Sequence, residues 1–208
     1  MKLIDIPAVY ICPDHNPKYN ERKQHMDTLL KSIGFKTIIH FKSGTEEYPT
    51  CLAKATIAIL NQFLNDEPVI IFEDDVEPFF ELNGDTEIEF PEDTDAFYLG
   101  LSKSGGSKTH NVDDGPSIVE PYSDKYIRIL NMLSAHAVLY ISKTYKEKVI
   151  EALNSIIGKA GYHSDVVISR LHSSYGIYAY HFPFFYQSSK FGNVQHVEDY
   201  TRFSFIRS

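Results

Sequence analysis

Short apolar runs alternate along the chain with segments in which apolar residues recur at helical spacing. The runs are rich in β-branched and aromatic residues, which is typical of buried strands, and the first three lie at residues 7–12, 35–41 and 69–72. Two stretches between them place apolar residues on one helical face, namely Met26, Leu29, Leu30 and Ile33 ahead of Gly34, then Leu52, Ala55, Ile59 and Phe63. This alternation of strands and helices builds a parallel sheet.

The remaining sequence predicts three more strands and two more helices. The strands are expected at residues 96–101, 135–141 and 177–182, and the helices at residues 143–157 and in a short stretch through Leu171. Residues 102–117 are polar and rich in Gly and Ser, which predicts either a plain surface loop or a lid over a ligand site. We therefore expect an α/β fold with a central, mostly parallel sheet flanked by helices.

Length, cysteine content and net charge narrow the class of protein. With 208 residues and 43% hydrophobic content, the chain can bury one core, and a single domain over residues 1–208 is the simplest organisation. Cys12 and Cys51 provide no disulfide framework, and Asp5 and Pro7 interrupt any leader sequence, so we expect a cytoplasmic protein. No apolar stretch approaches the roughly 20 residues of a membrane helix. A formal net charge of −8 argues against broad contact with nucleic acid.

The strand at residues 69–72 runs directly into three adjacent carboxylates, Glu73, Asp74 and Asp75. Ligands bind at the carboxyl ends of strands in open α/β sheets. Neighbouring carboxylates repel one another unless solvent or a hard divalent cation screens them. Alternate residues of an extended segment point the same way, so Glu73 and Asp75 can share one pocket while Asp74 faces another. The cluster thus predicts either a site for Mg²⁺ or Mn²⁺ or a solvated loop after a core strand.

Several segments in a fixed order resemble one enzyme family. They are the strand and loop 9–15 with a following helix that carries Arg22, the helix 51–64 before the acidic strand end 72–76, the strands 97–100 and 135–142, Asp165, and the segment 182–187. Together they resemble the glycosyltransferase family of bacterial lipopolysaccharide galactosyltransferases and procollagen galactosyltransferases, from Val9 to about His196. The chain departs from that family at Cys12-Pro13 and Ala53-Lys54, where members often carry Asn-Leu and Ser-His.

The resemblance implies a GT-A fold, a nucleotide-sandwich α/β domain that binds a nucleotide sugar together with Mn²⁺ or Mg²⁺. Its nucleotide-sugar-binding part would occupy about residues 1–105, and its acceptor-binding and catalytic part about residues 106–208. The family favours a UDP-sugar donor and transfer with inversion. The acceptor stays open among a glycan, a lipid-linked glycan, a protein side chain and a modified nucleobase, and the acidic charge balance disfavours the last of these.

The resemblance also suggests roles for individual residues. Asp75 would hold the metal, with His196 or His181 as a second ligand. Glu73 and Asp74 would bind hydroxyl groups of the ribose or the sugar. The further candidates for contacts with the donor are Tyr10, Cys12, His15, Arg22 and Lys103.

Inverting transfer needs a general base that takes the proton from the acceptor hydroxyl, and Asp165 is the candidate. The alternative is a purely structural role, because Ser164 or Asp165 ahead of an apolar stretch would serve equally well as a helix N-cap.

Two other functions compete with glycosyl transfer. A Mg²⁺-dependent phosphoryl-transfer enzyme also places acids at strand ends, but such enzymes normally begin this spacing with a nucleophilic Asp, where this chain has Glu73. A sugar- or nucleotide-binding module without turnover is the other alternative, and the presence of both Asp75 and Asp165 favours activity over it. A P-loop enzyme is excluded, because no Gly-rich loop ends in Gly-Lys-Ser or Gly-Lys-Thr.

Overall fold

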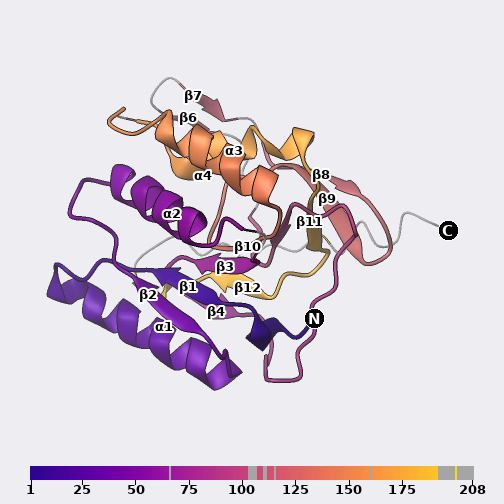
Figure 1. The fold of residues 1–208 in the computed structure, drawn as a ribbon, viewed down its shortest axis with the longest axis horizontal. Coiled ribbons are helices and arrows are strands. Elements are labelled where there is room, and N and C mark those ends of the chain that lie inside the picture. The colour runs from indigo at the N-terminus through magenta and orange to yellow at the C-terminus, as the bar shows by residue number, and fades with distance from the viewer. Residues whose placement is uncertain are drawn as a thin grey trace.

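The computed structural model describes residues 1–65, 67–102, 107–109, 112–114, 116–159, 161–191 and 200. Its centre is an eight-stranded sheet with the strand order β2-β1-β3-β10-β5-β11-β9-β8 (Figure 1). The strands are β1 (Ala8–Ile11), β2 (Ile38–Phe41), β3 (Val69–Phe72), β5 (Ala96–Tyr98), β8 (Ile118–Pro121), β9 (Tyr126–Asn131), β10 (Ala137–Tyr140) and β11 (Ile177–Tyr180). Six of them run in one direction, and β9 and β10 run against these six.

Helices cover both faces of this sheet (Figure 1). The helices are α1 (Asn20–Ile33), α2 (Thr50–Gln62), α3 (Lys143–Asn154) and α4 (Ser164–Ser169). Helix α1 packs on one face, and α2, α3 and α4 pack on the other. The expected α/β fold with a mostly parallel central sheet flanked by helices is therefore confirmed. No helix in the part of the chain described above has the length and apolar character needed to span a membrane.

Two smaller ladders lie outside the main sheet. In one, β4 (Val76–Pro78) pairs antiparallel with β12 (Phe185–Gln187), and in the other β6 (Ser107–Thr109) pairs with β7 (Val112–Asp114). The β6–β7 ladder lies within residues 102–117, where the sequence predicted only a loop. The hairpin of β8 and β9 was not predicted, because β8 is largely exposed and carries no apolar alternation. The first ladder is important for the site, since it carries the chain back to the end of β3.

The alternation of side chains along β1 explains how the core divides. Val9 and Ile11 belong to the cluster on the α2 side, and Ala8 and Tyr10 belong to the cluster on the α1 side. Helix α1 ends where Gly34 adopts a φ of +95° and donates its N–H to the carbonyl groups of the last helical turn. The short connection from the end of α1 to Ile38 places β2 beside β1, and the two strands pair in parallel.

A fully buried lysine stabilises the segment that connects α2 to β3 and the acidic cluster. The ammonium group of Lys146 on α3 donates hydrogen bonds to the carbonyl oxygens of Phe63 (2.8 Å) and Glu67 (2.6 Å). These two carbonyls lie between the end of α2 and the start of β3. Buried carbonyl groups need such partners, and Lys146 therefore fixes the connection that delivers β3 to the site.

A buried histidine predicts acid sensitivity. The Nε2 atom of His172 lies 3.0 Å from the hydroxyl of Tyr98, its Nδ1 has no hydrogen-bond partner among the described residues, and burial lowers its pKa to about 3. In the unfolded chain this histidine takes up a proton near pH 6.5, whereas in the folded protein it stays neutral. The free energy of unfolding is therefore at its full value above pH 6.5 and falls as the pH drops below it, by about 1.4 kcal/mol per pH unit at most. Urea unfolding at pH 7.0, 5.5 and 4.5 measures this slope. The variant His172→Gln is expected to have a shallower slope, and an unchanged slope would contradict the assignment.

Candidate functional site

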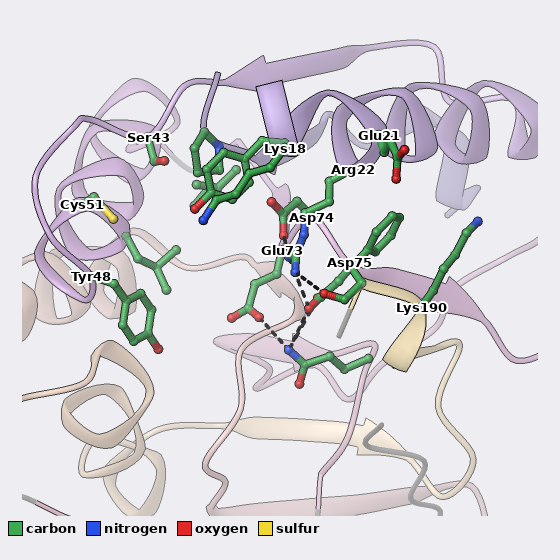
Figure 2. A pocket seen from close by; sticks show the side chains of 16 residues that line it. Lys18, Glu21, Arg22, Ser43, Tyr48, Cys51, Glu73, Asp74, Asp75 and Lys190 are labelled. Carbon is green, nitrogen blue, oxygen red and sulfur yellow. Dashed lines mark hydrogen bonds and ion pairs between the residues drawn. The ribbon is translucent and has the colours of Figure 1, made fainter. Parts of the chain in front are cut away.

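The acidic cluster opens into a cavity of about 700 Å³ at the carboxyl edge of β1 and β3 (Figure 2). Its walls come from β1 and the loop after it, the short helix Pro17–Tyr19, the first turn of α1, the segment between β2 and α2 with the first turn of α2, the end of β3, and β12 with the short helix Ser189–Phe191. The lining residues are Ile11, Pro13, Lys18, Tyr19, Glu21, Arg22, Ser43, Tyr48, Cys51, Leu52, Glu73, Asp74, Asp75, Gln187, Lys190 and Phe191. The position and volume are those of a small-molecule site in an open α/β sheet.

Arg22 and Asp74 form an ion pair on one wall of this cavity. The guanidinium Nη1 lies 2.6 Å from Oδ1 of Asp74 and 3.8 Å from Oδ2 of Asp75, and Nη2 donates to the carbonyl of Phe191 at 3.2 Å. The Arg22 and Asp74 side chains are only 17% and 11% exposed. Arg22 also lies over the ring of Phe191, 5.2 Å from its centre. Arg22, in the first turn of α1, therefore fixes the position of the Asp74 carboxylate at the end of β3.

The side chains of Glu73 and Asp75 converge on a single amide group. The Nε2 atom of Gln187 lies 3.4 Å from Oε2 of Glu73, 3.5 Å from Oδ1 of Asp75 and 3.2 Å from its Oδ2 (Figure 2). Pairing of β12 with β4 sets Gln187 opposite Val76, and Ser188 donates its N–H to the carbonyl of Asp75 at 2.8 Å. Two carboxylates and one amide from distant parts of the sequence therefore share one point in the cavity.

The surroundings of Glu73 alter its proton affinity. Burial raises its pKa to about 8, and the charges of Asp75, Asp165 and Asp74 add to the rise, while Arg22 opposes it. Unless a cation balances the cluster, this carboxyl group is mostly protonated at pH 7, below its pKa of about 8. A bound cation would therefore reduce the repulsion among these acids.

A second, smaller chamber of about 170 Å³ lies behind Glu73. It shares Ile11, Tyr48, Leu52, Glu73 and Gln187 with the large cavity, and its other walls are Thr56, Ile71, Leu133, Ser134, Ala135, Tyr140, Ser164, Asp165 and Ile168. Asp165 lies in the first turn of α4, and its Oδ1 accepts the N–H of Val166 at 2.9 Å. The N-cap position belongs to His163, so neither Ser164 nor Asp165 is the N-cap considered from the sequence.

Three of the predicted donor contacts lie away from the cavity wall. Tyr10 is fully buried on the α1 side, donates its hydroxyl proton to Asp27 at 2.7 Å and stacks on His40. Cys12 is also buried on that side, and burial together with nearby Asp74 raises the pKa of its thiol. His15 is exposed in the loop after β1, with its ring 5.8 Å from the ring of Tyr19.

The two histidines proposed as metal ligands have different positions. Both ring nitrogens of His181 contact backbone carbonyl groups, Nδ1 that of Tyr200 at 3.2 Å and Nε2 that of Ser123 at 2.9 Å, and His181 lines neither cavity. His196 lies outside the described residues, and so does Lys103. Within the described ranges, no three His, Cys, Asp or Glu side chains gather as a metal-binding group.

The cavity also contains residues that the sequence analysis did not single out. Lys18 and Lys190 add positive charge, Tyr19 and Phe191 add aromatic faces, and Gln187 joins the two acids. Gln187 lay within the family-like segment 182–187 and had no role assigned. Only the pairing of β12 with β4 reveals its position, and no local sequence pattern indicates it.

The Arg22–Asp74 pair predicts a measurable loss of stability. Arg22→Met leaves a largely buried carboxylate without its partner, and we expect the free energy of unfolding to fall by about 3 kcal/mol in urea titrations. The double variant Arg22→Met/Asp74→Leu should recover most of that loss, because neither charge remains. The exposed pair of Lys2 and Asp85 serves as control, since Lys2→Met should change stability far less. A double variant as unstable as the single one would contradict this interpretation.

Comparison with known proteins gives little further information. No protein-family model matches the chain, and no curated protein matches it. One solved structure that is similar is the CTP:phosphocholine cytidylyltransferase from Streptococcus pneumoniae, with 9% sequence identity, a TM-score of 0.45, and coverage of 88% of this chain and 93% of that one. This likeness is too distant to support an argument about either fold or function.

Proposed function

We propose that this protein is a metal-dependent glycosyltransferase that moves a sugar from a nucleotide diphosphate sugar, with UDP-sugars first among candidates, to an acceptor hydroxyl. The observation that carries the proposal is the convergence of Glu73 and Asp75 inside a cavity of about 700 Å³ at the carboxyl edge of the sheet. That volume suits a ligand of nucleotide-sugar size. The family resemblance and the GT-A architecture that it implies support the same function.

The donor set around Glu73 and Asp75 suits Mg²⁺ or Mn²⁺. Both ions take oxygen ligands, and Mg²⁺ commonly needs only one or two protein carboxylates because phosphate oxygens and water complete its shell. A half-turn of the Gln187 amide would present its oxygen where the nitrogen now lies. Glu73, Asp75 and Gln187 would then hold the ion. Bound there, the metal would neutralise the negative charge that develops on the leaving diphosphate.

Other features of the cavity support a nucleotide ligand. Lys18 and Lys190 supply positive charge for the diphosphate, and Arg22, paired with Asp74, lines the same cavity. Ser43 is buried in the wall, and its hydroxyl has no hydrogen-bond partner among the described residues, so a polar group of the base or the ribose could satisfy it. Tyr19, which also lines the cavity, offers an aromatic face on which a base could stack.

Asp165 is the candidate general base in this proposal. The acceptor oxygen would form a bond to the anomeric carbon while the bond from that carbon to the diphosphate oxygen breaks, with its electron pair leaving on the diphosphate. The acceptor proton would pass to the carboxylate of Asp165, which lines the inner chamber beside Glu73. A single displacement of this kind inverts the configuration at the anomeric carbon.

Release of the nucleoside diphosphate tests this function. The protein is incubated with a panel of nucleotide sugars, with Mn²⁺ or with EDTA, and free nucleoside diphosphate is quantified by chromatography. We expect release from one nucleotide sugar, by transfer to an added acceptor or to water, and only with the metal. Release of inorganic phosphate from nucleotides, with no nucleoside diphosphate formed from any nucleotide sugar, would favour the phosphoryl-transfer alternative. Binding of a nucleotide sugar with no transfer to any acceptor and no hydrolysis would favour the alternative of a binding module without catalytic activity.

A further inference from the structure

A shallow groove of about 480 Å³ lies at the end of the sheet that β5, β11 and β9 form, away from the cavity at β1 and β3 (Figure 1). Two segments far apart in the sequence form its walls, residues 90–93 ahead of β5 and residues 122–126 between β8 and β9. None of its described lining residues lines the large cavity or the inner chamber. A ligand of this groove would therefore bind separately from the nucleotide sugar.

Aromatic rings form much of the groove's surface. Phe90, Tyr122 and Tyr126 line it, and Tyr122 is 44% exposed. The rings of Phe90 and Tyr126 both pack on the buried ring of Phe97, with centres 5.9 Å and 6.2 Å apart, and Tyr122 packs on the buried ring of Tyr178 at 4.7 Å. The lining rings are thus held from beneath by the core of the sheet.

The wall formed by residues 90–93 is also fixed in place. Tyr178 donates its hydroxyl proton to Oδ2 of Asp93 at 2.8 Å, and a Cβ atom on Gly176 would lie 1.9 Å from the carbonyl oxygen of Asp93. The N–H and the hydroxyl of Thr94 both donate to the carbonyl of Pro91, at 3.1 Å and 2.6 Å. The groove is therefore formed before any ligand binds, which lowers the entropic cost of binding.

The charge of the groove is negative. Glu92 and Asp93 line it, and no Lys or Arg side chain is among the described residues that do. The surrounding stretch, residues 87–95, holds five acidic residues and neither Lys nor Arg. Partners that bind such a surface carry complementary positive charge, and this excludes nucleic acid as the occupant.

Lys125 shows how rings and acids beside the groove hold a cation within the molecule. Its ammonium group pairs with Glu89 at 2.5 Å and lies over the rings of Tyr126 and Tyr180, 5.6 Å and 5.7 Å from their centres. Tyr126 also lines the groove. The groove itself offers the same combination of aromatic rings and carboxylates to a cation from outside.

We propose that this groove binds an extended segment of a partner protein, through an arginine side chain that lies over Tyr122 and pairs with Glu92 and Asp93. Arginine suits the groove better than lysine, because its flat guanidinium group stacks on aromatic rings and can bond a carboxylate through two N–H groups. The volume of about 480 Å³ leaves room for neighbouring residues of that segment. The inference does not rest on the proposed function.

Selection from a phage-displayed library of random peptides on the immobilised protein tests the inference. Enriched peptides are synthesised with a fluorescent label, and their dissociation constants are measured by fluorescence anisotropy. We expect the enriched peptides to share an arginine. Replacement of that arginine by citrulline, which keeps the shape and removes the charge, should weaken binding at least about tenfold. An array of neutral glycans and sedimentation analysis of the protein alone cover the other possible occupants.

Four variants of the protein assign the binding to this groove. Tyr122→Ala and Glu92→Lys should each weaken the selected peptide at least about tenfold. The control for the ring is Phe182→Ala, since Phe182 is 40% exposed and does not line the groove. The control for the charge is Glu147→Lys, an equal change at an exposed position of α3 on the other face of the sheet. Both controls should bind within about twofold of the parent, and melting temperatures verify that all four variants are folded.

Each contrary result overturns the inference. Selection that enriches no arginine-bearing peptide does so, and so does a citrulline peptide that binds as tightly as its arginine counterpart. Peptides that bind Tyr122→Ala and Glu92→Lys as tightly as the parent occupy another surface. Glycan binding or self-association that Tyr122→Ala abolishes would assign the groove to a saccharide or to a second copy of this chain. All measurements are made without nucleotide sugar or metal, so failure of the proposed function leaves their outcome unchanged.

Discussion

Replacement of Asp75 by alanine is expected to abolish metal-dependent binding of the donor, with at least about a 100-fold loss of affinity in the presence of Mn²⁺. Asp75 is almost fully buried at the centre of the cavity, and both of its carboxylate oxygens approach the Gln187 amide that Glu73 also contacts. Its removal leaves one carboxylate where the proposed metal site has two. Calorimetric titration of a nucleotide sugar, with Mn²⁺ and with EDTA, measures the effect.

The matched control for this variant is Asp85→Ala. Asp85 is 94% exposed, pairs with Lys2 and lies outside the cavity, so its loss should leave the metal-dependent affinity unchanged. The Asp75→Ala protein should remain folded, because removing one of several mutually repelling carboxylates relieves repulsion on Glu73. Parent-like donor affinity of Asp75→Ala in Mn²⁺ would mean that the metal does not bind at this residue.

The second large effect is expected for Asp165→Asn, which should bind the donor within about twofold of the parent and lose transfer by about 10²- to 10⁴-fold. Asparagine keeps the Oδ1 atom that accepts the N–H of Val166, so the first turn of α4 is preserved. It cannot take a proton from the acceptor. Initial rates of transfer under saturating donor, together with the dissociation constant of the donor, separate the two functions of the site.

A purely structural role of Asp165 predicts a different result. In that case Asp165→Asn would transfer at near-parent rates, because the local hydrogen bond survives the substitution. Comparison of melting temperatures excludes a folding defect as the cause of any loss. A variant that retains transfer would therefore remove Asp165 from the role of general base.

The first half of the fold could be predicted because its signals are local. The strands β1, β2 and β3 and the helices between them follow from apolar runs and helical spacing, and the acidic residues follow β3 directly. Helix α3 also begins at Lys143 as expected but ends at Asn154, three residues before its predicted end. The division of function near residue 105 stays a prediction, although strands from both halves lie side by side in one sheet.

The alternation of residues along β1 accounts for which of its side chains reach the cavity. Ile11 lines the cavity, while Tyr10 and Cys12 belong to the opposite core. Alternation places Tyr10 and Cys12 on one face of the strand and Ile11 on the other, so these three residues cannot all line one cavity.

The rest of the site depends on pairings between distant segments, which periodicity cannot reveal. Strand β10 enters the sheet antiparallel between β3 and β5, and the backbone carbonyl of His136, just before β10, accepts the N–H of Glu73 at 2.9 Å. The ladder of β4 and β12 brings Gln187 to the acids. The inner chamber combines Glu73 with Asp165 only because α4 packs beside these strands. Each of these contacts joins residues far apart in sequence.

The central claim is that the cavity around Glu73 and Asp75 binds a nucleotide sugar with a divalent metal, and thermal unfolding tests it most directly. The melting temperature is measured with a panel of nucleoside diphosphates and nucleotide sugars, each with Mn²⁺ and with EDTA. A ligand at 100 times its dissociation constant stabilises the folded state by about 2.7 kcal/mol, which shifts the midpoint clearly. We predict a shift with one nucleotide and its sugar conjugates that requires Mn²⁺, whereas no shift with any ligand, or equal shifts in EDTA, would contradict the claim.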